Sequence, residues 1–101
     1  MSAFIFVQAQ VTDPEKFAAY TQVVPALVEQ FGGVYRILGG DVECLEGEWD
    51  RAAVVISEWP TKAAAEAFWQ SPEYQQARVL REGTGSFQVL LIADNSATPL
   101  T

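Results

Sequence analysis

Residues 3–11 read AFIFVQAQV, and residues 13–15, which follow after a single threonine, read DPE. In a strand, successive side chains point to opposite faces, so Phe4 and Phe6 lie on one face while Ile5 lies on the other. A sheet with one face in water alternates apolar with polar residues, but this segment is largely apolar on both sides. The pattern predicts a strand over residues 3–11 that is covered on both faces.

The DPE segment predicts the start of a helix. Asp13 can accept a hydrogen bond from the free backbone N–H groups, and Pro14 suits the first helical position. Apolar residues then recur at helical spacing as far as Phe31, with a kink expected at Pro25 because proline lacks a backbone donor. Gly32-Gly33 predicts the end of this helix.

The rest of the chain repeats the same plan. A strand is predicted over residues 34–38, and residues 42–45 are expected to resume its pairing beyond a bend at Gly39-Gly40. A strand over 52–59 follows. The remaining predicted elements are a short helix from Thr61, a second helix from Ser71 to Leu80, and a strand over 87–92. Each half reads strand, helix, strand, and such crossovers are right-handed. The order predicts an α+β fold of the β-α-β-β-α-β kind, a four-stranded antiparallel sheet with its helices on one face. We expect one domain over residues 1–93 and a flexible tail over 94–101.

Composition narrows the classes of function. The 101 residues carry a formal net charge of −7, which disfavours nucleic acid and anionic membrane surfaces as partners. No apolar run is long enough to span a membrane, and a cytoplasmic location is the simplest interpretation. The sequence contains no histidine, which excludes histidine metal ligands, histidine general bases and a proximal histidine for haem. We therefore expect no metal and no cofactor, and we interpret the lone Cys44 as a packing residue.

The face of the sheet that the helices leave uncovered predicts self-association. That face would expose phenylalanine and branched aliphatic side chains, at a cost of roughly 25 cal/mol for each Å² of apolar area. A second copy of the chain is the simplest cover, because most oligomers are symmetric assemblies of one chain. We expect a homodimer whose sheets pack face to face.

A set of short motifs resembles a known family. The motifs, in chain order, are Asp13-Pro14-Glu15, Tyr20, Gly32-Gly33, Gly39-Gly40, Glu46-Gly47-Glu48-Trp49, Glu58-Trp59-Pro60, Trp69, Ser71-Pro72-Glu73-Tyr74 and Arg81. From about residue 4 to residue 92 this order resembles the domain-of-unknown-function family 1330. The resemblance implies a ferredoxin-like fold in the dimeric α/β-barrel group, which includes cofactor-free monooxygenases, haem-degrading enzymes, isomerases and dehydratases. Trp59 stands where a phenylalanine is more usual and would narrow a cavity.

Glu58 and Arg81 are the candidate catalytic pair. A carboxylate on a mostly apolar strand needs a partner or shifts its proton affinity, and Arg81 and Arg36 are the available partners of Glu58. In the functional interpretation Glu58 takes a proton, Arg81 holds developing negative charge and Arg36 contributes to ligand binding. In the alternative interpretation these residues form only a structural ion pair.

Three aromatic residues are the candidate walls of a pocket between sheet and helices. Tyr20, Trp69 and Tyr74 would suit a flat organic molecule, although packing in the core or the dimer interface is the default role of such residues. Ser71 has no histidine to activate it and is interpreted as a helix cap. The acidic residues of 41–50 lack the spacing of a calcium loop and are interpreted as a solvated surface. The leading hypothesis is a small-molecule-binding domain or cofactor-independent enzyme; the alternative is a non-catalytic homodimerisation module.

Overall fold

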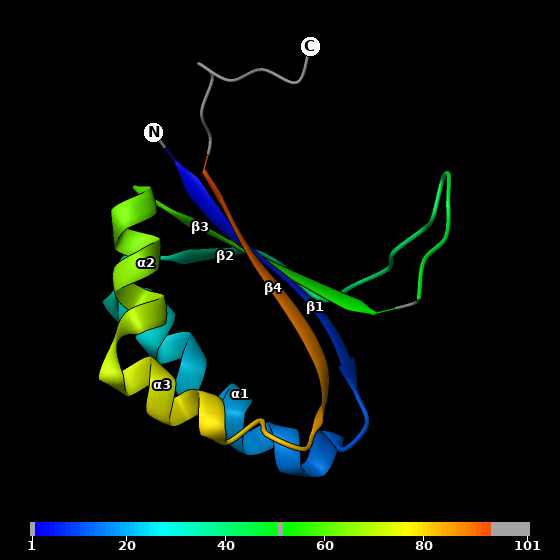
Figure 1. The fold of residues 1–101 in the computed structure, drawn as a ribbon, viewed down its shortest axis with the longest axis horizontal. Helices are drawn as coiled ribbons and strands as arrows, with labels where there is room; N and C mark the ends of the chain where they lie inside the picture. The colour runs from blue at the N-terminus through cyan, green and yellow to red at the C-terminus, as the bar shows by residue number, and fades with distance from the viewer. Residues whose placement is uncertain (1, 51, 94–101) are drawn as a thin grey trace.

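The computed structural model describes residues 2–50 and 52–93, and within them it has the predicted architecture. The elements in chain order are β1 (Ala3–Val11), α1 (Pro14–Gln30), β2 (Val34–Leu38), β3 (Ala53–Trp59), α2 (Lys62–Gln70), α3 (Pro72–Val79) and β4 (Gly85–Ala93). All strand pairs are antiparallel, in the order β2-β3-β1-β4. Figure 1 shows the helices gathered on one side of this sheet. The α+β ferredoxin-like prediction is confirmed, and the tail predicted at residues 94–101 lies outside the described residues.

The helices begin where the sequence predicts. The Asp13 side chain accepts a hydrogen bond from the backbone N–H of Lys16, which caps α1. The Ser71 hydroxyl accepts one from the N–H of Tyr74, so the capping interpretation of Ser71 is confirmed. These caps satisfy backbone donors that have no partner inside the helix. Between them they fix where α1 and α3 start, and both helices carry residues of the site.

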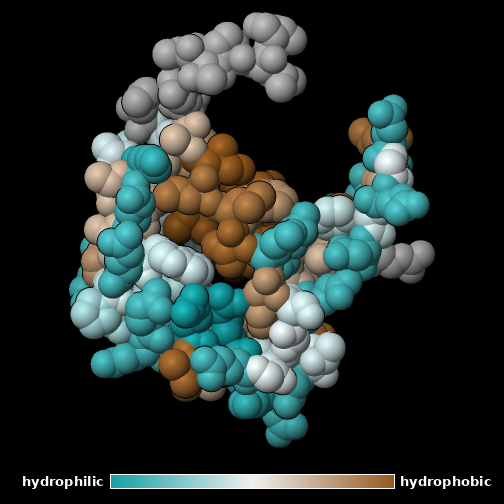
Figure 2. Space-filling model, viewed as in Figure 1, coloured by the Kyte–Doolittle hydropathy of each residue, from teal (hydrophilic) through white to brown (hydrophobic). Residues whose placement is uncertain are grey.

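Strand register separates two sets of side chains. Ile5, Val7 and Ala9 of β1 pair with Leu91, Val89 and Phe87 of β4, and this set faces the helices. The alternate set, in which Phe4 pairs with Ile92 and Phe6 with Leu90, occupies the other face, which we call the helix-free face. Figure 2 shows hydrophobic residues gathered over the sheet, between the helices and the projecting loop. On the helix-free face Leu90 is 51% exposed and Ile92 is 46% exposed, so this single chain leaves the predicted apolar surface uncovered.

The segment between β2 and β3 differs from the prediction. Gly39 and Gly40 have φ values of +82° and +109°, which favour glycine, and the chain leaves the sheet there. The predicted resumption of pairing at residues 42–45 is wrong, since residues 40–50 form no strand. They form a loop that projects from the body (Figure 1). Cys44 lies exposed in this loop, so its interpretation as a packing residue is also wrong.

The acidic side chains of the projecting loop are exposed, as expected for a solvated surface. Across residues 2–50 and 52–93, no three acidic or cysteine side chains come together in an arrangement that could hold a metal ion. In the same described part of the chain, no helix has the length and apolarity needed to cross a membrane.

The core is centred on Trp59, at the end of β3. Its side chain is 1% exposed, and its ring lies 4.8 Å from the ring of Phe68 on α2. The indole N–H donates to the Ser57 hydroxyl at 2.9 Å. On its other side the ring packs directly on Gly33, where an added Cβ would lie 2.7 Å from two indole carbons. Glycine at position 33 is therefore required by the close approach of the ring.

Candidate functional site

A cavity of about 350 Å³ lies between the helices and the sheet. Ile5, Val7 and Val89 form part of its floor on the sheet, and Val24 and Val28 line it from α1. We call this cavity the cleft. Its aromatic lining residues are Phe17, Tyr20, Tyr35, Phe68, Trp69, Tyr74 and Phe87. Such a cavity, small and mostly apolar with a few polar groups, is typical of sites for small organic molecules.

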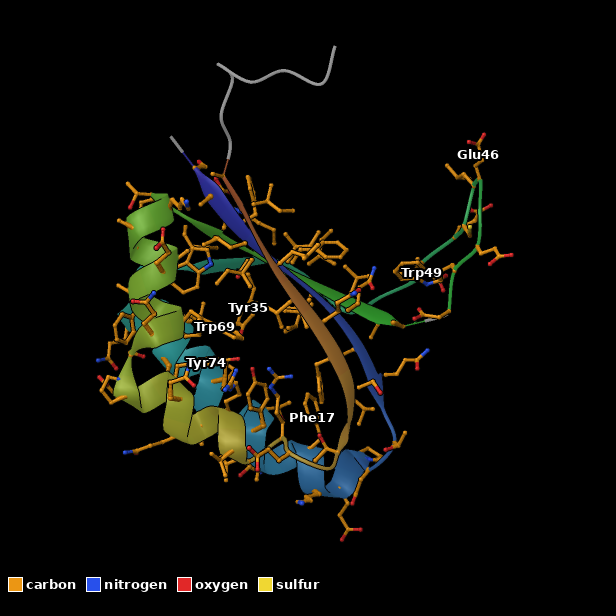
Figure 3. All side chains as sticks on the ribbon, viewed as in Figure 1. Phe17, Tyr35, Glu46, Trp49, Trp69 and Tyr74 are labelled. Atoms are coloured by element: carbon orange, nitrogen blue, oxygen red, sulfur yellow. The ribbon has the colours of Figure 1, made fainter. Side chains whose placement is uncertain are left out.

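The aromatic lining comes from distant parts of the chain. Phe17 stacks between two rings, with centroid distances of 5.4 Å to Tyr20 and 5.6 Å to Phe87. Trp69 and Tyr74 are 5.1 Å apart by the same measure. Figure 3 shows Tyr35, Trp69, Tyr74 and Phe17 in the space between the helices and the sheet. Mutual ring contacts of this kind hold the walls in place without a ligand.

Tyrosine hydroxyls form the polar part of the wall. The Tyr20 and Tyr74 hydroxyl oxygens are 3.0 Å apart and share a hydrogen bond. Burial raises the pKa of Tyr20 well above its ordinary value, and the neighbouring Tyr74 raises it further. Burial, followed by the proximity of Tyr74, also raises the pKa of Tyr35 to about 12. Both phenols therefore stay protonated at neutral pH and are available as hydrogen-bond donors.

Arg81 is the cationic residue among those that line the described cleft. Its guanidinium carbon lies 4.3 Å from the centre of the Phe87 ring and 5.6 Å from that of Tyr20. Its Nε is shielded from water and finds no hydrogen-bond partner among the described residues. Both described salt bridges, Arg36–Glu58 and Lys62–Glu66, leave Arg81 out. Arg81 is thus a partly buried cation held by aromatic rings and without a carboxylate partner.

The turn after α3 positions Arg81. The backbone carbonyl of Arg81 accepts hydrogen bonds from both the N–H and the hydroxyl of Thr84, which is fully buried. The Thr84 carbonyl in turn accepts from the N–H groups of Thr12 and Asp13, at the end of β1. The guanidinium is therefore anchored to a turn that is fixed to the start of α1.

Glu58 lies on the other side of the sheet. It pairs with Phe4 and Val34 in the strand register, so its side chain belongs to the helix-free face. There its Oε1 accepts from Arg36 Nε at 2.8 Å, and its Oε2 accepts from the Ser2 hydroxyl at 3.0 Å. These two hydrogen bonds, the one from Arg36 first, hold the pKa of Glu58 below its ordinary value. The expected pairing of Glu58 with Arg81 is wrong, because the two residues lie on opposite sides of the sheet. Arg36, the other predicted partner, forms the ion pair with Glu58.

The predicted site residues thus fall into two groups. Tyr20, Trp69, Tyr74 and Arg81 all line the cleft, whereas Arg36 joins Glu58 on the helix-free face. Trp59 does not line the described cleft and so does not narrow it.

The lining residues that sequence reasoning missed are Phe17, Tyr35, Ser57, Phe68 and Phe87. Helical spacing signals the first of them, since Phe17 precedes Tyr20 by three positions on α1.

Solved structures share this fold at low sequence identity. A protein of unknown function from Rhodopseudomonas palustris is 19% identical, with a TM-score of 0.73 over 94% of this chain and 83% of that one. A dimeric ferredoxin-like protein of unknown function from Jannaschia sp. CCS1 is 14% identical, with a TM-score of 0.69 over 91% and 98%. SnoaB, a cofactor-independent oxygenase from Streptomyces nogalater, is 15% identical, with a TM-score of 0.66 over 98% and 96%. These similarities show the fold.

Comparison by sequence gives one family. The model of the family described as "Domain of unknown function (DUF1330)" matches residues 2–95. No curated protein matches the chain.

Proposed function

Because the chain belongs to the DUF1330 family, a domain of unknown function, we propose its function from the geometry of the cleft. The chain binds a compact, flat organic molecule between the sheet and the helices. The observation that carries the proposal is the cavity of about 350 Å³, whose lining includes seven aromatic residues. Aromatic walls contribute large contact areas and prefer flat partners. Protein interiors are close-packed with few large voids, so a cavity of this size favours a binding role.

The catalytic form of the proposal is a cofactor-independent reaction of the bound molecule, the kind of activity named for SnoaB, which shares the fold. The described lining holds no carboxylate, and the chain has no histidine. In the cleft, the groups able to polarise a substrate therefore include the Arg81 guanidinium and the hydroxyls of the tyrosines and of Ser57. Glu58 is not part of this site, because it lies on the helix-free face.

We further propose that the chain works as a homodimer through its helix-free face. Leu90 and Ile92 are about half exposed there in the single chain, and a patch of this kind usually marks an interface. The Jannaschia protein of the same fold is described as dimeric. On its own this face supports the alternative function, a non-catalytic dimerisation module. Ligand binding in the cleft distinguishes the small-molecule-binding function from this alternative.

A substitution that fills the cleft tests the proposal. Val7 lies on the floor of the cleft, on the central strand β1, so Val7→Phe is expected to occupy the space of the ligand. We expect affinity for 2-naphthamide, a flat neutral probe, to fall at least ~10-fold, the change that a loss of about 1.4 kcal/mol produces. Isothermal titration calorimetry measures this affinity.

Val79→Phe is the matched control. Val79 is 57% exposed near the end of α3 and does not line the cleft, so this variant should bind the probe as the unchanged protein does. Equal affinity in the Val7→Phe variant and in the unchanged protein would contradict a binding role for the cleft.

A further inference from the structure

We infer that the molecule bound in the cleft is an aromatic anion, a carboxylate or an enolate, whose charged oxygen lies against Arg81. This inference rests on the proposed binding function and names the class of ligand. The cleft provides hydrogen-bond donors and a positive charge. Its described lining contains no carboxylate that could accept a hydrogen bond from the ligand.

Arg81 supplies the charge. The Phe87 ring, 4.3 Å from the guanidinium carbon, covers one face of the planar guanidinium. The terminal N–H groups lie in the plane of the guanidinium and point away from the ring. Two in-plane N–H groups match the two oxygens of a carboxylate. Arg81 has no carboxylate partner among the described residues. Its Nε is enclosed by the protein, so the terminal N–H groups are the ones available for a ligand.

The tyrosine pair supplies a further donor. Tyr20 and Tyr74 share one hydrogen bond at 3.0 Å, and a phenol has one proton to donate. Whichever hydroxyl donates within the pair, the other keeps its proton for a ligand. Burial raises the pKa of Tyr20, so the Tyr20 phenol stays neutral and does not repel an anion.

Ser57 adds another donor on the floor of the cleft. Its oxygen accepts the indole N–H of Trp59 at 2.9 Å, which leaves the serine proton free. A ligand with a neutral hydrogen-bond acceptor would satisfy these hydroxyl groups. Only a ligand with a negatively charged group would also form an ion pair with Arg81. The chain as a whole has a net charge of −7 and repels anions, so we expect anion binding to be confined to this site.

The test compares two probes of the same shape. 2-Naphthoate and 2-naphthamide both present two fused rings, and they differ in the charge of the group attached to them. We expect the unchanged protein to bind 2-naphthoate at least ~10-fold more tightly than 2-naphthamide at neutral pH, as charge-assisted hydrogen bonds are the stronger kind. In an Arg81→Met variant this ratio should fall to about 1, and in Arg81→Lys it should lie between the two.

Arg78→Met is the matched control. Arg78 lies in the last turn of α3, three residues before Arg81; it is exposed, its guanidinium carbon is 5.4 Å from the centre of the Trp69 ring, and it does not line the cleft. This variant removes the same charge and should keep the full preference. Retained binding of 2-naphthamide reports that the cleft of each variant is folded.

The outcomes separate the two proposals. Equal affinity of the unchanged protein for both probes would overturn the anion inference and leave the binding function standing. A preference that survives Arg81→Met, or one that is lost in Arg78→Met, would also overturn it. Failure of both probes to bind the unchanged protein would overturn the proposed function itself.

Discussion

Replacing Trp59 by alanine is expected to lower the free energy of unfolding by about 3–5 kcal/mol, the usual cost of deleting a buried tryptophan side chain. The ring is 1% exposed and packs between Phe68 and Gly33, so its removal leaves a cavity that rigid neighbours cannot close. Loss of the ring also removes the hydrogen bond that its indole N–H donates to Ser57. Chemical unfolding measures the change, at one fixed protein concentration because dimer stability depends on concentration.

Position 33 provides the control for this packing argument. Gly33→Ala should cost about 1–3 kcal/mol, because the new Cβ would lie 2.7 Å from indole carbons. In a Trp59→Phe background those carbons are absent, so the same alanine should cost much less. A cost at position 33 that is the same in both backgrounds would contradict direct contact between the two residues. The exposed Val79→Ala variant should change stability by less than about 0.5 kcal/mol.

Replacing Leu90 by glutamate is expected to convert a dimer into a monomer. Leu90 is 51% exposed in the single chain, so a polar side chain there does not disturb the protomer's own core. In a face-to-face dimer it would bury an unpaired carboxylate, at about 2 kcal/mol or more for each copy. Each dimer holds two copies, and the dissociation constant should rise more than ~100-fold.

Sedimentation equilibrium measures this effect. At micromolar concentration we expect twice the 11.1 kDa mass of the chain for the unchanged protein and the single mass for Leu90→Glu. Val79→Glu adds the same charge at an exposed position on α3 and should stay dimeric. A monomeric unchanged protein, or a Leu90→Glu variant that remains dimeric, would contradict an interface on the helix-free face.

Local sequence signals predicted the fold because they act over short distances. Asp13 and Ser71 cap helices through bonds to residues three positions away, which a sequence displays directly. The apolar character of both faces of β1 likewise follows from alternation alone. The prediction for residues 42–45 was wrong because Gly39 and Gly40 take positive φ values, and the chain leaves the sheet at this bend without returning to it before β3.

The site was harder to predict because it depends on strand register. Both alternating sets of β3 contain apolar residues, for example Val55 on the side of the cleft and Ile56 on the helix-free face. The sequence therefore cannot tell whether Ser57 or Glu58 faces the helices. A shift of one residue in the strand register moves a side chain to the other face of the sheet. In the observed register Glu58 lies on the face opposite to the cleft that holds Arg81. The strand register is irregular between Tyr35 and Ile37. The alternation of side chains along β2 therefore does not predict which face of the sheet Arg36 occupies.

A crystal structure of the protein grown with 2-naphthoate tests the role of the cleft most directly. We expect the fused rings to lie between Phe17, Trp69 and the strand floor, with the carboxylate within hydrogen-bond distance of the Arg81 guanidinium. A cleft closed by its own side chains, with the probe absent or bound only on the helix-free face, would show that the cleft is not the binding site.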